Sequence, residues 1–308
     1  MGGTKSPEKR RQGGLGGLFQ TMPLSELQKV ILATIWENRS ETSHLAGASA
    51  IQASPASIRY SGDIDLFHDN ETAVSEAFAK DRSALEEADF AIKVMLSQPG
   101  FIRAQVARGG ESILMDWAHD SAWRFMPTVS LEGIGHVLHP VDLAVNKVLA
   151  LGGRDEPRDW VDILYLDAKF ISLGAMVWAA VGKDPGMNPE MLLELLSRKG
   201  KIRQRDLDRL ILTPEVKLEA LHAQWTKSLA EAKAFVSSRP PSEAGRLYID
   251  PKSGEFFTPA RGDDYELCEA TVGGIVPRLN ELEQTIFRES MGERQELEKF
   301  FGNRLSGK

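Results

Sequence analysis

The sequence predicts an α+β protein, with a small mixed sheet flanked by helices followed by a mainly helical region. Three observations support this class. Short apolar runs bounded by glycines, which are typical of strands, fall before about residue 139. Apolar residues at helical spacing occur along the chain and dominate after residue 140. Hydrophobic residues make up 42% and charged residues 26% of 308 positions, as in globular chains large enough for two domains.

The chain is therefore expected to have three parts. Residues 1–20 are rich in glycine and carry a basic cluster at 9–11, which indicates a disordered tail. An inert tail is the simpler interpretation, and a contact with nucleic acid is the alternative. Residues 21–139 are expected to form the mixed domain, and residues 140–308 the mainly helical domain.

Local signals predict the first elements. Residues 23–39 are amphipathic, and Ser25 followed by Gln28 is a capping-box pattern, so a helix is expected there. Residues 44–55 are mostly small, which indicates the end of a strand, a tight turn and the first turn of a helix. An apolar strand is expected at 61–67.

The next segment is expected to contain two helices and a hairpin. Residues 70–100 have a helical pattern in two pieces that ends at Pro99-Gly100. Residues 101–120 contain two apolar runs joined by Gly109-Gly110, a strong signal for a β-hairpin. A short strand is expected at 134–139.

The second half is expected to be helical with one hairpin. Pro140 at the start and Gly152 near the end predict a helix over 140–153. Further helices are expected at 156–170, 213–239 and 280–304, and a hairpin at 246–257 that turns at 252–254.

Composition narrows the classes of function. The single cysteine, Cys268, excludes an intramolecular disulfide and fits a reducing cytoplasm, where we expect the protein. No run of 18 apolar residues occurs and no apolar leader begins the chain, so neither a membrane span nor a secretory signal is expected. A net charge of −7 argues against broad binding to duplex nucleic acid, although a local basic groove for RNA remains compatible. The six histidines lack the spacing of zinc ligands.

Two aspartates interrupt the apolar strand "GDIDLF". Asp63 and Asp65 share one face of a strand, with Cα atoms about 6.6 Å apart, and this spacing suits Mg²⁺ with substrate phosphates. Asp116, in the second strand of the predicted hairpin, would complete a two-metal site for displacement at phosphorus. With 44 acidic residues in 308, chance alone gives about six acid-x-acid pairs, so a salt-bridged or edge-strand pair stays an open alternative.

A small-residue turn precedes these aspartates. Gly47-Ala48-Ser49 leads into the predicted helix, and backbone N–H groups at such a turn can cradle phosphates. An ordinary helix N-cap by Ser49 is the alternative interpretation.

Together these stretches resemble a known family. "GASAI" followed by "RYSGDID" is similar to the signature of the polymerase-β nucleotidyltransferase superfamily, and most of all to the AbiEii-type toxins of type IV toxin–antitoxin systems. That family has Gly-Gly-Thr-Ala-Leu, then Arg-x-Ser-x-Asp-Ile-Asp. "ILMDWA" resembles its strand with the third acid, and "VDLAVNKVLALGGRDEPRDWVDILYL" resembles its helix pair. The resemblance covers roughly residues 44–170. Ala48 departs from the second glycine, which is tolerated if φ there is negative.

The resemblance implies a role for each matching acid. Asp63 and Asp65 would hold the metal and the triphosphate, and Asp116 would complete the metal site or act as general base. Asp159, in preference to Asp162, would be a further catalytic acid.

The resemblance also implies contacts to the phosphates. Lys147 would lie over the active site and offset charge on the triphosphate or the leaving pyrophosphate. Arg158 is a candidate for a phosphate contact or a structural ion pair, as is Arg59. The nucleotide and phosphate contacts would come from Gly47, Ser49, Arg59, Ser61 and Lys147.

The expected activity is that of a nucleotidyltransferase using Mg²⁺ or Mn²⁺ and an NTP substrate, with release of pyrophosphate. The resemblance implies a toxin with a cognate antitoxin and an RNA acceptor such as tRNA. Two alternatives stay open: a non-toxin enzyme that modifies a small molecule or a protein, and a non-catalytic nucleotide-binding protein.

Overall fold

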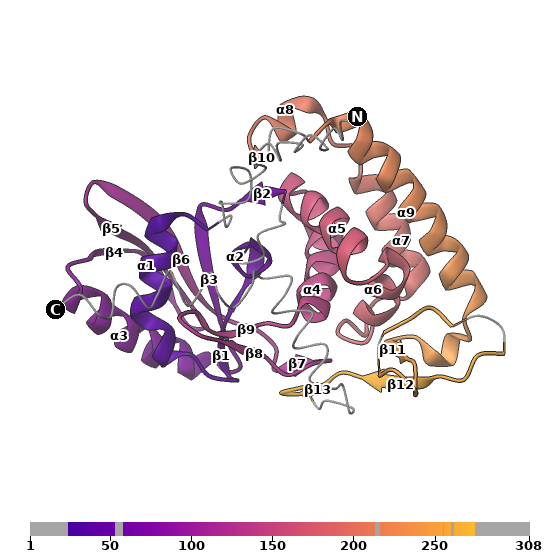
Figure 1. Cartoon of the computed structure of the whole chain (residues 1–308), viewed down its shortest axis with the longest axis horizontal. Coiled ribbons are helices and arrows are strands. Elements are labelled where there is room, and N and C mark those ends of the chain that lie inside the picture. The colour runs from indigo at the N-terminus through magenta and orange to yellow at the C-terminus, as the bar shows by residue number, and fades with distance from the viewer. Residues whose placement is uncertain (1–23, 53–57, 213–215, 255, 260–261, 275–308) are drawn as a thin grey trace, which may run out of the picture.

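The computed structural model describes residues 24–52, 58–212, 216–254, 256–259 and 262–274. The expected tail at 1–20 and the expected helix at 280–304 lie outside these ranges. Figure 1 shows the main sheet in one half of the described chain and the helices that follow residue 139 in the other.

A seven-stranded mixed sheet forms the first half, in the order β4-β5-β6-β3-β1-β9-β8. Its centre is β3 (Asp63–His68), which runs antiparallel to β1 (Ser43–Ala46) and parallel to β6 (Glu111–His119). The other strands are β4 (Ala91–Gln98), β5 (Phe101–Arg108), β8 (Val129–Leu131) and β9 (Gly135–Val137). This mixed sheet confirms the predicted fold class.

Two helices cover one face of this sheet. They are α1 (Glu26–Ile35), continued by a 3₁₀ turn at Trp36–Asn38, and α3 (Glu71–Glu87). The capping box of Ser25 and Gln28 is present, as the sequence predicts. Under these helices Ile64 on β3 and Trp117 on β6 are fully buried. Because side chains alternate along a strand, Asp63, Asp65 and Asp116 belong to the opposite face.

The prediction of helix over 70–100 is wrong in its second part. Residues 71–87 are helical, but 91–98 form β4, which pairs with β5. Pro99-Gly100 is the hairpin turn between them, with Gly100 at φ +70°, and not a helix end. Partner strands override helical spacing in a segment this short. The predicted hairpin at Gly109-Gly110 is confirmed, with φ of +63° and +88° at its two glycines.

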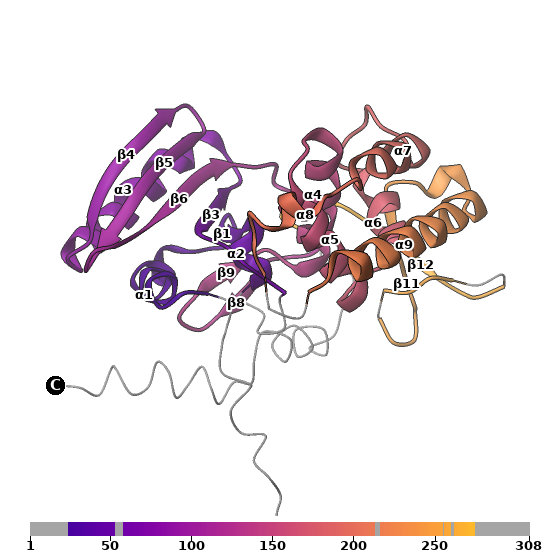
Figure 2. The same ribbon diagram turned by 90° about the horizontal axis from the view of Figure 1, so that it is seen from above.

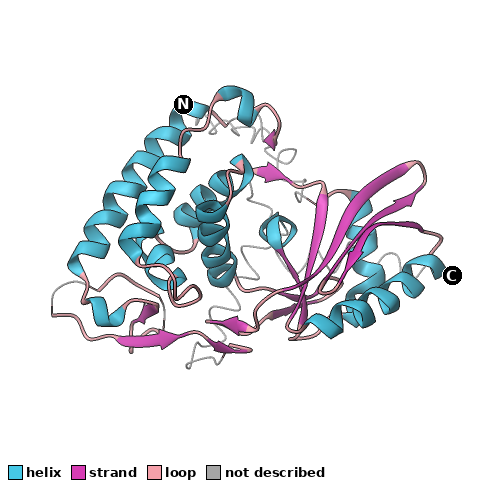
Figure 3. Cartoon of the chain, turned by 180° about the vertical axis from the view of Figure 1, so that it is seen from behind, coloured by secondary structure: helices cyan, strands magenta, loops and turns pink. Residues whose placement is uncertain are grey.

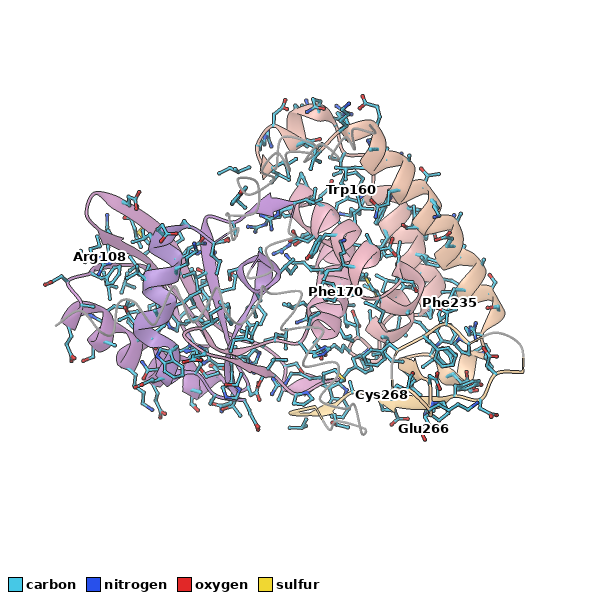
Figure 4. The ribbon with its side chains drawn as sticks, in the orientation of Figure 1. Arg108, Trp160, Phe170, Phe235, Glu266 and Cys268 are labelled. Carbon is cyan, nitrogen blue, oxygen red and sulfur yellow. The ribbon has the colours of Figure 1, made fainter. Side chains whose placement is uncertain are left out.

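The second half is mainly helical, as predicted. The helices predicted at 140–153 and 156–170 appear as α4 (Pro140–Gly153) and α5 (Pro157–Lys169). They are followed by α6 (Leu173–Ala180), α7 (Pro189–Lys199), α8 (Gln204–Leu207) and α9 (Leu218–Ser238). In Figures 1 and 2, α9 runs along the outside of α5, α6 and α7. Figure 4 labels Trp160 of α5, which packs against His222 and Trp225 of α9.

Small strand pairs connect distant segments. β2 (Arg59–Tyr60) pairs with β10 (Ile211–Leu212), and β7 (Trp123–Arg124) pairs with β13 (Thr271–Val272). Both pairs tie the sheet half to segments of the second half, and Figure 3 shows these strands away from the main sheet.

The predicted hairpin over 246–257 is only partly correct. β11 (Arg246–Ile249) pairs with β12 (Glu266–Glu269), while Phe256 makes a single bridge back to Ile249. The 3₁₀ turn before β11 spans Pro241–Glu243. The chain does turn near Gly254, at φ +75°, but the later segment 266–269 occupies the pairing edge of β11.

No single helix within the described ranges is long and apolar enough to cross a membrane. Helices α5 and α6 reach that length and hydropathy only when taken together, and the chain bends by 114° between them. Cys268 is buried on β12.

Candidate active site

The Asp-x-Asp pair stands on the sheet face that α1 and α3 leave uncovered. Asp63 and Asp65 alternate with Ile64 and Leu66, which are fully buried on the opposite face. The side chain of Gln28 fixes the start of this strand, because its Nε2 donates to the carbonyl oxygens of Ser61 and Asp63, each at 3.1 Å. Helix α1 therefore positions the strand from behind.

Asp116 lies directly beside Asp65. The parallel register of β3 and β6 pairs Asp65 with Asp116, and the side chain of Asp116 is largely buried. Arg103 on β5 faces Asp116 from the other side and donates to its two oxygens at 2.7 and 2.6 Å. The structure thus brings all three predicted metal ligands to one face of adjacent strands.

The turn at Gly47 closes over Asp65. Gly47 has φ +60°, and a Cβ built on it would lie 1.9 Å from Oδ2 of Asp65. Only glycine permits this approach and this conformation together. Ala48 is not among the described residues with positive φ, so an alanine is tolerated there.

Ser49 connects this turn to the aspartate strand. Its hydroxyl is fully buried, donates to the carbonyl of Ala46 at 3.1 Å and accepts from the backbone N–H of Asp65 at 3.4 Å. In this conformation the hydroxyl holds β3 against α2 (Gly47–Gln52), so it faces the protein and not a phosphate.

Negative charge accumulates at Asp65. Burial, and then the charge of Asp63, raise the pKa of Asp65 to about 6, while Lys147 acts in the opposite direction. Asp63 is better compensated, since it accepts from the hydroxyl of Ser61 and pairs with Arg158 at 3.3 Å. Among the described residues no salt bridge reaches Asp65. A carboxylate in this position favours an external cation.

Lys147 belongs to a buried ion network. Its Nζ lies 2.9 Å from a carboxylate oxygen of Asp159 and 2.9 Å from one of Asp162. Burial by itself lowers the pKa of Lys147, but the charges of Asp162 and Asp159 outweigh burial and raise it. The ammonium group is therefore charged, and its charge acts on Asp65.

Two arginines complete this network. Arg59 donates to both oxygens of Asp162 at 3.0 and 2.9 Å, and Arg154 donates to Asp159 at 2.7 and 3.1 Å. Although burial opposes it, Lys147 first and then these arginines lower the pKa of both aspartates.

Several predicted site residues thus have structural partners. Asp159 is fully buried and holds Lys147, and Arg59 makes a buried ion pair, the structural one of its two predicted roles. Asp162, the less favoured acid, bridges Lys147 and Arg59 and is as deeply buried. Arg158 is 36% exposed beside Asp63 and can reach a ligand.

The three carboxylates suit a divalent cation by chemical type. Their oxygens are the ligands that Mg²⁺ takes, and Asp65 is poorly compensated. Within the described ranges no group of three or more His, Cys, Asp or Glu side chains is already arranged around one ion position. Arg103 holds the Asp116 carboxylate, and Ser61 with Arg158 holds that of Asp63.

Sequence reasoning missed Gln28, Arg103 and Arg154. The pairing of Arg103 could have been predicted from the sequence, because counting outward from the Gly109-Gly110 turn places Arg103 opposite Asp116. Gln28 gave no such signal, since its contact with β3 spans distant parts of the chain.

Comparison with known proteins identifies a family. A family model described as "Nucleotidyl transferase AbiEii toxin, Type IV TA system" matches residues 40–246, about two thirds of the chain. No curated protein matches the chain.

Seven chains of solved structures match this chain. The crystal structure of JHP933 from Helicobacter pylori is 17% identical and covers 70% of this chain and 95% of its own, with a TM-score of 0.45. MenT4, nucleotidyltransferase toxin Rv2826c from Mycobacterium tuberculosis H37Rv, is 15% identical and covers 70% of this chain and 84% of its own, with a TM-score of 0.48. The family assignment rests on the family model alone.

Proposed function

The chain belongs to the AbiEii family of type IV toxin nucleotidyl transferases, and on this premise we propose that it uses a divalent cation, Mg²⁺ or Mn²⁺, to transfer NMP from an NTP to an RNA hydroxyl. The observation that carries the proposal is the row of carboxylates at Asp63, Asp65 and Asp116 beside the Gly47 turn. A cognate antitoxin is the expected protein partner, and tRNA is the acceptor we propose to test first.

The proposed metal ligands are Asp63, Asp65 and Asp116. When bound, the cation supplies positive charge against the phosphate oxygens and favours displacement at phosphorus. The poorly compensated charge of Asp65, whose pKa burial raises to about 6, supports this assignment. Binding a cation relieves the repulsion between Asp65 and its neighbours.

The remaining residues act on the triphosphate. Arg158 lies beside Asp63 and is partly exposed, so it can bind a phosphate oxygen. Arg154 is 49% exposed and pairs with Asp159, so we propose it as a second arginine for the triphosphate. Lys147 contributes the positive charge of its ammonium group, which ion pairs with Asp159 and Asp162 hold in position.

The reaction balances without a further reactant. The acceptor oxygen forms a bond to the α-phosphorus, the bond from that phosphorus to pyrophosphate breaks, and the hydroxyl proton passes to water. Positioning and charge neutralisation account for most of the rate in such transfers.

The test is label transfer from each α-labelled NTP to total tRNA in the presence of Mg²⁺. We expect the wild type to label RNA, and Asp63→Asn and Asp65→Asn to lose at least about 100-fold in rate. Asp155→Asn, an exposed aspartate before α5, is the control and should retain activity. Equal labelling by the wild type and both site variants would refute the site. Labelling of protein or a small molecule in place of RNA would refute the acceptor but keep the site.

A further inference from the structure

Some arginine–aspartate pairs are buried on both sides, whereas the pair of Arg103 and Asp116 has an exposed arginine, as does the pair of Arg154 and Asp159. Arg39 with Asp81, and Arg59 with Asp162, have both side chains at most 4% exposed. Arg103 is 45% exposed, while its partner Asp116 is 12% exposed. An arginine at a water-exposed position therefore holds a carboxylate that lies next to Asp65.

This exposure makes the pair exchangeable. If a fully buried arginine leaves its carboxylate, unsatisfied donors stay behind in the core, and the cost is high. The guanidinium group of Arg103 can rotate toward the solvent and donate its hydrogen bonds to water, so releasing Asp116 costs little free energy. Asp116 then needs another cation, because the charges of Asp65 and Asp63 lie on the same face.

The two oxygens of Asp116 that Arg103 occupies are the oxygens a metal ion would need. The contacts at 2.7 and 2.6 Å form a bidentate pair, which uses both oxygens at once. Arg103 and a divalent cation thus compete for one carboxylate.

We propose that Arg103 is a positioning residue that holds Asp116 while the site is free of metal and releases it when a divalent cation binds. Arg103 thereby sets the metal affinity of the site and keeps the charge of Asp116 paired between turnovers. The inference rests on the proposed function, because it takes Asp116 as a metal ligand.

The test is direct titration of the full chain with Mn²⁺, followed by the electron paramagnetic resonance signal of free Mn²⁺, so that no turnover is needed. Arg103→Gln should bind Mn²⁺ about three- to tenfold more tightly than the wild type. Arg103→Lys, which keeps the charge but not the bidentate fork, should lie between them. Arg82→Gln removes an equally exposed arginine from the Glu86 pair on α3 and should bind Mn²⁺ as the wild type does.

A double-mutant cycle separates competition from general electrostatics. In an Asp116→Asn background, Arg103→Gln should change Mn²⁺ affinity less than twofold, since the contested carboxylate is gone. A gain that persists in that background would show a long-range charge effect and overturn the proposal. Unchanged or weaker Mn²⁺ binding by Arg103→Gln, at an unchanged melting temperature, would also overturn the proposal. So would a lower melting temperature of Arg103→Gln with no change in Mn²⁺ affinity.

Failure of the underlying function has a different outcome. If the wild type and Asp65→Asn bind Mn²⁺ equally, the metal site itself is wrong, and the proposal for Arg103 ends with it. If Asp65→Asn loses binding but Arg103→Gln behaves as the wild type, only the role of Arg103 is refuted.

Discussion

A single hydrogen atom at Gly47 decides whether the candidate site can form. Its Cβ position lies 1.9 Å from an oxygen of Asp65, and its backbone adopts φ +60°. Gly62, two residues before Ile64 on the same segment, has open space around its Cβ position. The two glycines therefore form a matched pair for mutation.

Gly47→Ala should lose about 100-fold or more of the transfer rate, because Asp65 must move by about an ångström. It should also lower the free energy of unfolding by about 1–3 kcal/mol through strain at positive φ. Gly62→Ala should change both quantities little. Labelling assays and urea unfolding measure the two effects, and equal activity of the two variants would contradict the close approach.

The raised pKa of Asp65 means that its ionised carboxylate lowers the stability of the folded protein. Burial raises the pKa of the folded carboxyl from 3.8 to about 6, so the folded state binds a proton more tightly than the unfolded chain. Stability is therefore lost as pH rises between these two values, and the cost is complete above about pH 6.

Asp65→Asn should therefore stabilise the metal-free protein at pH 7.5, by about 1–3 kcal/mol. The gain should shrink as the pH is lowered and vanish below about pH 4. Urea unfolding of both proteins at several pH values in the presence of a chelator measures this. A gain that is constant with pH would point to packing and not to charge.

At the scale of elements, three polar residues of α4 each make a different set of contacts. Asp142 accepts from the backbone N–H groups of Phe125 and Met126 at 2.9 and 3.0 Å, and so binds the segment after β7. Asn146 links Asp120 with Lys183. Lys147 faces the ion network at the candidate site. The "DLAVNK" pattern thus combines support of the fold with a site residue.

Asp142→Ala should destabilise the protein by about 2–4 kcal/mol, because two buried N–H groups lose their acceptors. Asp155→Ala, at an exposed position just after α4, should change stability by less than about 0.5 kcal/mol. Chemical denaturation monitored by tryptophan fluorescence compares them. Similar stability of the two variants would show that water or a rearranged loop replaces the Asp142 contacts.

At the scale of the whole molecule, the site spans both halves of the chain. The carboxylates come from the sheet, whereas Lys147, Asp159 and Arg158 come from α4 and α5. Arg59 of β2 joins the halves through its bidentate pair with Asp162 of α5. Figures 1 and 2 show α2, with the Gly47 turn at its start, between the sheet and these helices. The candidate site therefore draws residues from both sides of residue 139.

We therefore expect a single cooperative thermal transition for the wild type by calorimetry, although its length would allow two domains. Arg59→Ala should lower stability by about 3–5 kcal/mol, since it leaves a buried carboxylate with one partner fewer. Arg246→Ala, which removes a surface pair with Glu269, is the matched control and should have little effect. Two separate transitions in the wild type would contradict coupling through Arg59.

Local sequence signals determined much of the fold. The capping box at Ser25, the Gly109-Gly110 hairpin and the helix that begins at Pro140 all depend on residues close together in the chain. The segments that differed, 91–98 and 246–257, depend on partner strands, and pairing energy outweighs the local pattern there.

The sequence by itself determined that this chain carries the nucleotidyl transferase pattern, with an Asp-x-Asp strand and a glycine turn before it. Only the tertiary structure decided which charges meet. It set Asp116 between Asp65 and Arg103, and it buried Lys147 between Asp159 and Asp162. The physical reason is that a carboxylate's chemistry depends on burial and on the nearest opposite charge, and these neighbours come from strands and helices far apart in sequence.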